Sequence, residues 1–185
     1  MVSGQWWEIT GLPVLKYLEG QAPDYLGRYY TDTLKWSDKE LEKCHDQVQW
    51  VFPLHEASKH AFVHPVVTKD IAELASTSEK VRANLLAATE RYKEFFGIGN
   101  YWDSKKHALW FTSGNHNLLR ITRIIRSLRL FGLETEAANF RNAAIAAGPG
   151  DLSPEEARDV LSYWYHAIAD DIWTPMQKKE NPCEV

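Results

Sequence analysis

Residues 113–132 read SGNHNLLRITRIIRSLRLFG, and this stretch indicates the fold class. Its apolar side chains recur every three or four residues, which is the spacing of one face of an α-helix. That apolar stripe consists of Leu118, Ile121, Ile124, Ile125, Leu128 and Phe131. A helix with one apolar stripe packs against other elements of a core. We therefore expect a core-facing helix from about Asn115 to Phe131 that stops at Gly132.

Similar periodicity recurs through most of the chain. A serine followed three residues later by glutamate is a helix-start signal, and it occurs at Ser37, Ser76 and Ser153. We expect helices at residues 37–52, 68–75, 76–96, 115–131, 135–147 and 153–173, and the pattern also allows a short helix at 13–19 that Gly20 stops. The segments 21–36, 53–67 and 98–114 carry prolines, glycines and aromatic residues without this periodicity. Because no alternating strand pattern of useful length is present, we predict an all-α fold. It would be a single compact multi-helix domain with two long aromatic-rich irregular segments.

Length and composition limit the domain organisation and the location. At 185 residues the chain has the length of one domain. We expect an N-terminal arm at residues 1–23, the helical domain at 24–175 and a C-terminal tail at 176–185. No apolar run suits a transmembrane helix, and no basic start with an apolar stretch predicts a signal peptide. Cys44 and Cys183 form no disulfide framework, which suits a reducing cytosol, so we expect a cytoplasmic protein.

The helix at 115–131 contains the first candidate binding site. It carries four arginines and no acidic residue, although the whole chain has a net charge of −4. Near the start of a helix, unpaired backbone N–H groups and the helix dipole favour an anion. The candidate site residues are His116, Asn117, Arg120 and Arg123. We expect Arg126 and Arg129 to point to water. The pattern also allows Arg120 and Arg123 to pair with acidic helices of the same domain.

The expected helix at 37–52 contains the second candidate. His45 and Gln49 are four residues apart and would share a face, whereas Trp50 would point to a different side. A histidine and an amide on one face could contact a ligand or orient a water molecule. The alternative is a half-buried histidine that hydrogen-bonds the backbone. His45 and Asp46 cannot easily chelate one metal ion, because adjacent helical residues diverge by about 100°.

Known cofactor and catalytic motifs are absent from the sequence. There is no Gly-x-Gly-x-x-Gly motif, Walker loop or Gly-x-Ser-x-Gly elbow. The loop histidines His55, His60 and His64 lack a spaced Cys/His quartet or acidic triad that would complete a zinc site. We therefore expect neither a cofactor nor a metal ion.

Two long blocks resemble the signature of the opioid growth factor receptor conserved-region family. These blocks are LEKCHDQVQWVFPL at residues 41–54 and HNLLRITRIIRSLRLFGL at residues 116–133. The stretch DYLGRYY at 24–30 and the block VRANLLAATERYKEFFGI at 81–98 also resemble that family. The resemblance extends over roughly residues 24–175 and coincides with both candidate sites.

The resemblance implies a helical fold and recognition of a ligand, and it implies no catalytic residues. The vertebrate member of the family is described as an intracellular receptor for an enkephalin peptide that restrains growth. Its long repeat-rich C-terminal region has no counterpart here. The chain is similar to the stand-alone members that occur in microbes.

Three functions follow as hypotheses. The first is a non-enzymatic binding module for an anionic, phosphate-bearing, nucleotide-like small molecule or signal. Its site would be formed by the candidate residues of the two helices, which are His45, Gln49, Trp50, His116, Asn117, Arg120 and Arg123. An aromatic wall would be formed by Tyr29, Tyr30, Trp102 and Trp110. The second is an enzyme that acts on a phosphoester or glycosidic bond with His45 or His116 as acid or base. The third is a protein- or peptide-interaction module, which the tryptophan content allows. We do not expect nucleic acid as a partner, because one arginine-rich helix on an acidic chain gives a small basic surface. We expect no membrane partner, because no apolar run is long enough to span a bilayer.

Overall fold

Helix α8 (His116–Leu130) forms the centre of the core, as the apolar stripe predicts. The computed structural model describes residues 7–57, 63–148 and 150–175. Asn115 caps this helix by accepting a hydrogen bond from the Asn117 backbone N–H at 3.0 Å. The six apolar residues of the stripe are all buried, and Ile121, Ile124 and Ile125 have no solvent exposure. The prediction of an all-α domain is confirmed for the described residues.

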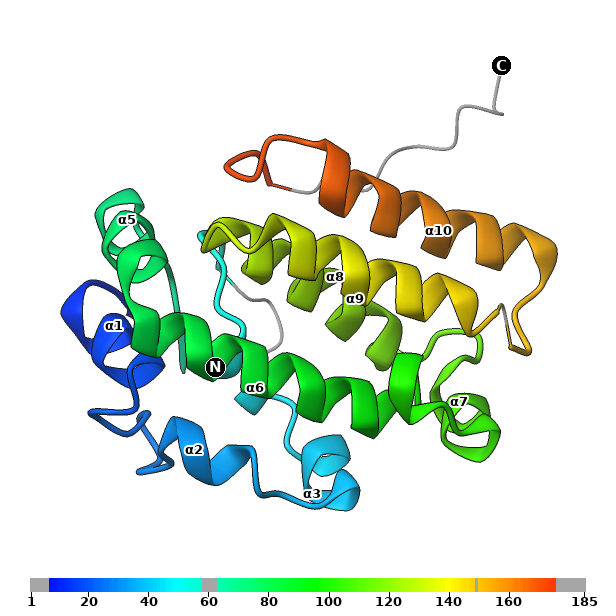
Figure 1. Cartoon of the computed structure of the whole chain (residues 1–185), viewed down its shortest axis with the longest axis horizontal. Helices are drawn as coiled ribbons and strands as arrows, with labels where there is room; N and C mark the ends of the chain where they lie inside the picture. Colours follow the sequence, from blue (N-terminus) through cyan, green and yellow to red (C-terminus); the bar gives the residue numbers. More distant parts are fainter. Residues whose placement is uncertain (1–6, 58–62, 149, 176–185) are drawn as a thin grey trace, which may run out of the picture.

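Three further long helices surround α8 (Figure 1). The helices α9 (Glu134–Ala146) and α10 (Pro154–Ala169) pack along α8, and α6 (Glu79–Phe96) contacts α9. Aromatic side chains fill the space between these helices, and Phe140 and Trp164 are fully buried there. The Trp164 indole N–H reaches the Leu118 carbonyl at 3.5 Å, so it is not left without a polar neighbour.

Shorter elements cover the two ends of α6. At one end lie α1 (Leu12–Leu18) and α5 (Lys69–Thr77), and at the other lies α7 (Ser104–Trp110). The helices α2 (Tyr30–Thr33) and α3 (Asp38–Lys43) lie along one side of α6 in Figure 1. A 3₁₀ turn, η1 (Gly99–Tyr101), leads into α7. None of the helices in the described part of the chain combines the length and apolar character needed to cross a membrane.

The segment predicted as an N-terminal arm contains ordered elements. The strand β1 (Trp7–Ile9) pairs in parallel with β2 (Val63–Pro65), although the sequence shows no strand pattern there. Helix α1 buries Val14, Tyr17 and Leu18. Residues 176–185, His60 and Cys183 lie outside the described residues.

The prediction of one continuous helix over residues 37–52 was wrong. Ser37 and Glu40 form the expected capping box, but α3 ends at Lys43 and α4 (Gln47–Val51) begins after a break. Cys44 is extended at the break. The Asp46 carboxylate there is held by the Arg28 guanidinium at 2.7 Å, an interaction from outside the helix that its own periodicity does not reveal. His45 and Gln49 therefore do not share the face of one helix.

Two further predictions require correction. The prediction that a helix starts at Ser76 was wrong, because α5 continues to Thr77. Ser78 instead caps α6 and accepts a hydrogen bond from the Val81 N–H. The segment 98–114 was predicted to be irregular, but it contains α7. Asp103 caps this helix by accepting hydrogen bonds from the N–H groups of Lys105 and Lys106. Seven helical residues give too few turns for a periodic apolar pattern.

Candidate functional site

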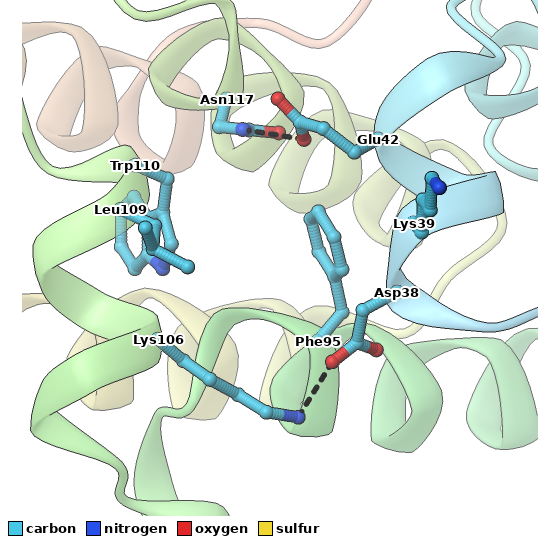
Figure 2. Close-up of a pocket in the computed structure, with 8 residues that line it drawn as sticks. All are labelled: Asp38, Lys39, Glu42, Phe95, Lys106, Leu109, Trp110 and Asn117. Atoms are coloured by element: carbon cyan, nitrogen blue, oxygen red, sulfur yellow. Dashed lines mark hydrogen bonds and ion pairs between the residues drawn. The ribbon is translucent and has the colours of Figure 1, made fainter.

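A pocket opens among α3, α6, α7 and α8 (Figure 2). Its volume is about 340 Å³. The lining residues are Asp38, Lys39, Glu42, Phe95, Lys106, Leu109, Trp110 and Asn117. These residues come from four separate segments of the chain, so the pocket exists only in the folded domain.

The floor and one wall of the pocket are apolar. Phe95 and Trp110 are 7% and 2% exposed, and the Trp110 indole N–H donates a 2.7 Å hydrogen bond to the Phe96 carbonyl. That bond fixes the indole and leaves its apolar surface toward the pocket. Leu109 is 78% exposed, although it is a large apolar side chain next to a cavity. A partner that covered Leu109 would remove apolar surface from water.

Gly97 brings α7 close to the end of α6, which shapes this wall. Gly97 caps α6 in the left-handed conformation, with φ of 63°. A Cβ atom at this position would lie 2.9 Å from both the Asp103 carbonyl oxygen and the Lys106 Cβ. Both the backbone angle and the close approach of α7 therefore require glycine.

Asp38 forms one polar edge of the pocket. Its carboxylate pairs with Lys106 at 2.8 Å and with Arg91 at 2.7 Å, and Figure 2 shows the Lys106 contact below Phe95. Partial burial by itself raises the pKa of Asp38, but the hydrogen bonds from Lys106 and Arg91 outweigh it and hold the pKa below its ordinary value. Asp38 thus ties α3 to α6 and α7 as a carboxylate.

Glu42 forms the opposite edge, one turn further along α3. Its Oε2 accepts a 3.0 Å hydrogen bond from the Asn117 amide and lies 3.5 Å from the Arg120 guanidinium. Its Oε1 lies 3.2 Å from His116 Nε2. Arg120 also donates to the Asn117 side-chain oxygen at 3.0 Å. The predicted anion-binding residues of α8 therefore converge on a carboxylate that belongs to the same chain.

The two histidines of the candidate sites lie side by side. The rings of His45 and His116 contact each other in a tilted arrangement, with centroids 4.7 Å apart and an angle of 39° between the ring planes. Burial lowers the pKa of His116, the charges of Arg120 and His45 lower it further, and the charge of Glu42 opposes these effects. These effects together favour the neutral form of His116, and Arg120 contributes a positive charge beside Glu42.

Several predicted site residues lie elsewhere. Gln49 and Trp50 are buried on α4, where the Trp50 ring packs against Tyr17 at 5.1 Å. Arg123 donates a 3.2 Å hydrogen bond to the Phe52 carbonyl, and burial lowers its pKa to about 10. These three residues do not line the pocket.

The predicted aromatic wall is also divided. Trp110 lines the pocket, but Tyr30 is fully buried and its hydroxyl donates to the Val51 carbonyl at 3.3 Å. Trp102 is 55% exposed and contacts the His107 ring, and Tyr29 is exposed on the segment before α2.

The expectation that Arg126 and Arg129 point to water was wrong. Arg126 is 3% exposed, lies 2.8 Å from a Glu56 carboxylate oxygen and donates to the carbonyls of Ile172 and Thr174. Arg129 donates to the carbonyls of Ala167 and Asp170. Both arginines fasten α8 to the C-terminal end of α10 and the residues after it, where carbonyl groups have no partner within the helix.

Glu42, Asp38, Phe95, Lys106 and Leu109 were missed as site residues. Asp38 and Glu42 belong to a short charged segment, DKELEK, and such a segment is more often a solvated face than part of a site. The contact between Glu42 and Asn117 joins residues that are 75 positions apart, so no local spacing reveals it. The sequence contains one weak indication for Leu109, because it is a large apolar residue three positions after the charged pair Lys105 and Lys106.

Metal binding finds no support in this geometry. Within residues 7–57, 63–148 and 150–175, no group of three His, Cys, Asp or Glu side chains could hold a metal ion. In the His45–His116–Glu42 cluster itself, His45 contacts the His116 ring, and Glu42 pairs with His116 and Arg120. Together with the pocket, it offers an apolar cavity with a polar edge.

Comparison with known proteins gives a family. The model of the opioid growth factor receptor conserved region matches residues 21–173. Opioid growth factor receptor-like protein 1 of Mus musculus is 35% identical over 167 residues, which cover 78% of this chain and 34% of the mouse protein. The opioid growth factor receptor of Homo sapiens is 32% identical over 121 residues, which cover 58% of this chain and 18% of the human protein.

The matched part of this chain thus spans only about a third or less of these curated relatives. No solved structure matches the chain. The family model covers most of the chain, including α3, α8 and every residue that lines the pocket. The chain therefore belongs to the opioid growth factor receptor conserved-region family.

Proposed function

We propose that this domain is a peptide- or protein-interaction module, and that its pocket receives an apolar side chain of the bound segment. The observation that carries the proposal is the pocket itself, with Phe95 and Trp110 as floor and Leu109 exposed at its edge. A volume of about 340 Å³ is at the lower end of the range of ligand sites, so it suits a small part of a larger partner.

The polar edges suit a peptide in particular. Asp38 and Glu42 stand one turn apart on α3, and Lys106 and Asn117 face them across the opening. A peptide presents N–H and carbonyl groups on either side of each side chain, and these edges offer acceptors and donors for them. An apolar floor with a few polar groups that fix orientation is the usual composition of a binding pocket.

The family names support the same proposal. Two relatives carry the name opioid growth factor receptor or receptor-like, which is a statement about those proteins. Transferred to this chain, a receptor name favours a macromolecular or peptide ligand over a reaction. Because the chain spans a small part of those relatives, the identity of their ligands is not transferred with it.

A nucleotide-like ligand and a hydrolytic reaction remain predictions from the sequence. Arg123, which the nucleotide hypothesis places in the site, donates to a backbone carbonyl away from the pocket. A reaction would require His45 or His116 to reach a substrate, but the two rings contact each other and neither residue lines the pocket. We therefore favour the peptide-interaction hypothesis.

Selection from a displayed library of random 12-residue peptides, followed by titration calorimetry of the enriched sequences, tests the proposal. We expect enriched peptides to share a large apolar residue. Leu109→Asp should weaken their binding by at least about tenfold, because it places a charge where apolar contact is made. Leu109 is mostly exposed, so this change should leave the fold intact.

Leu74→Asp is the matched control, since Leu74 is 52% exposed on α5 and does not line the pocket. It should bind the same peptides as the unmodified protein. Peptides that lose affinity equally in both variants, or a library that yields no apolar consensus, would contradict the proposal. A nucleotide panel in a thermal-shift assay checks the competing hypothesis.

A further inference from the structure

The donors of α8 already hold a carboxylate, and it comes from α3. Asn117 and Arg120 are 1% and 4% exposed, so both are buried and rigidly placed, and both point at Glu42. The arrangement has the composition of a carboxylate-binding site: an amide N–H, a guanidinium and an imidazole around two oxygens.

Glu42 is a partly exposed occupant of this site. Its side chain is 47% exposed, whereas the side chain of Arg120 is 5% exposed. Its carboxylate lies 3.5 Å from the guanidinium, longer than the usual charge-assisted hydrogen bond of about 2.7–2.9 Å, and it keeps contacts with Asn117 at 3.0 Å and His116 at 3.2 Å. Arg120 also donates to the Glu42 backbone carbonyl at 3.4 Å, so the guanidinium keeps a contact with α3 if the side chain leaves. A ligand carboxylate could replace the side-chain contacts that Glu42 would give up.

The site and the pocket are continuous. Glu42 and Asn117 line the pocket and also form the ion-pair cluster, and Figure 2 places them together above Phe95. A peptide with an apolar side chain on the floor would therefore have its neighbouring residue beside Arg120.

We propose that Glu42 is an internal stand-in for an acidic peptide ligand, whose carboxylate displaces Glu42 and takes the donors of Asn117 and Arg120. This proposal rests on the peptide-binding function of the pocket and names the chemical class that it selects. The ligand is a segment in which an aspartate, a glutamate or a C-terminal carboxylate adjoins a large apolar residue.

Charge balance favours a carboxylate over a phosphate. Arg120 contributes one positive charge, and in this structure a single carboxylate, that of Glu42, lies against it. A dianionic phosphate would add excess negative charge next to the displaced Glu42. Once displaced, Glu42 can pair with Lys39, which is exposed and three residues earlier on the same helix.

Thermal unfolding of Glu42→Ala in sodium acetate, sodium phosphate and sodium chloride at equal ionic strength tests the empty site. We expect acetate to raise the Tm of Glu42→Ala by a few degrees more than chloride does, because a small carboxylate refills the cluster. The unmodified protein, whose site is occupied, should show no such difference. Glu73→Ala is the control, since it removes the same charge from an exposed position on α5.

Equal effects of acetate on Glu42→Ala and Glu73→Ala would overturn the carboxylate site. A larger effect of phosphate than of acetate would overturn the assignment to carboxylates and would point to a phosphate-bearing ligand. Should Glu42→Ala fail to fold, Glu42→Gln keeps the size of the side chain. Acetate should then stabilise Glu42→Gln more than the unmodified protein, and equal stabilisation overturns the proposal.

Binding of 12-residue peptides that carry leucine followed by aspartate, asparagine or lysine provides the second test. We expect Glu42→Ala to bind the aspartate peptide about tenfold more tightly than the unmodified protein does, because the internal competitor is gone. Equal affinity for the aspartate and lysine peptides would overturn the proposal that Glu42 stands in for a ligand carboxylate. The apolar pocket would still be supported as a binding site if Leu109→Asp weakened the binding of both peptides. If no peptide binds and Leu109→Asp changes no affinity, the proposed function of the pocket is contradicted. The acetate experiment tests only the carboxylate site, so its result does not depend on peptide binding.

Discussion

The side-chain amide of Asn117 donates a 3.0 Å hydrogen bond to the carboxylate of Glu42, which lies 75 residues earlier in the chain. This bond joins α3 to the first turn of α8 at the edge of the pocket. It also joins the two blocks of sequence that carry the family resemblance. The contact therefore links fold stability and the candidate site through one pair of residues.

We predict that Asn117→Leu destabilises the domain by about 1–3 kcal/mol, because the buried Arg120 loses a hydrogen-bond acceptor and the partly exposed Glu42 loses a donor. Urea unfolding followed by tryptophan fluorescence measures the change. Asn139→Leu is the control, since Asn139 is exposed on α9. Its cost should be within about 0.5 kcal/mol of zero. Equal costs for the two variants would show that the Asn117 contact contributes nothing.

Acidification should remove stability through His116. Its pKa in the folded protein lies below the ordinary 6.5, because of burial, Arg120 and His45, against the opposing charge of Glu42. A group whose folded pKa is lowered adds stability that is complete above pH 6.5 and is lost as the pH falls through the folded value. We expect His116→Gln to flatten the fall in unfolding free energy below pH 6.5.

Burial also lowers the pKa values of His55 and His107. The unfolding free energy of the His116→Gln variant should therefore keep part of the pH dependence of the unmodified protein. Denaturation at a series of pH values checks both points. A His116→Gln curve that stays parallel to that of the unmodified protein would contradict the assignment.

Arg126 should matter more for stability than an exposed arginine. Arg126→Ala removes a buried guanidinium that pairs with Glu56 and donates to two carbonyls, and we expect a loss of about 2–4 kcal/mol. Arg82→Ala breaks a 2.7 Å ion pair with Glu136, but the Arg82 side chain is 52% exposed, so about 0–1 kcal/mol is expected. Calorimetric unfolding measures the loss of stability in both variants. A larger loss in Arg82→Ala than in Arg126→Ala would contradict this prediction.

Gly97 and Gly114 provide a matched pair. Both adopt positive φ, of 63° and 68°, but a Cβ at Gly97 meets Asp103 and Lys106, whereas nothing lies within 4 Å at Gly114. Gly114→Ala should therefore cost only the backbone strain of about 1 kcal/mol, and Gly97→Ala should cost at least about 1 kcal/mol more. Thermal unfolding of the two variants measures the difference. Equal losses would mean that the connection to α7 relaxes without cost.

Local signals predicted those elements that local interactions stabilise. The apolar stripe of α8 and the capping boxes at Ser37 and Ser153 are confirmed, because each depends on residues within a few positions of one another. The break at Cys44 was missed, and next to it Asp46 pairs with Arg28, 18 residues earlier, a contact that local periodicity does not reveal. Helix α7 was missed because its seven residues are too few to show a period.

By itself, the sequence determined the all-α class, the central position of α8 and the family, because hydrophobic periodicity and long blocks of similar sequence are properties of the chain in one dimension. The tertiary structure alone decided which acid meets which arginine, and it placed Phe95, Leu109 and Trp110 around one cavity. Such pairings depend on how the helices pack, and packing brings together residues whose separation along the chain carries no signal.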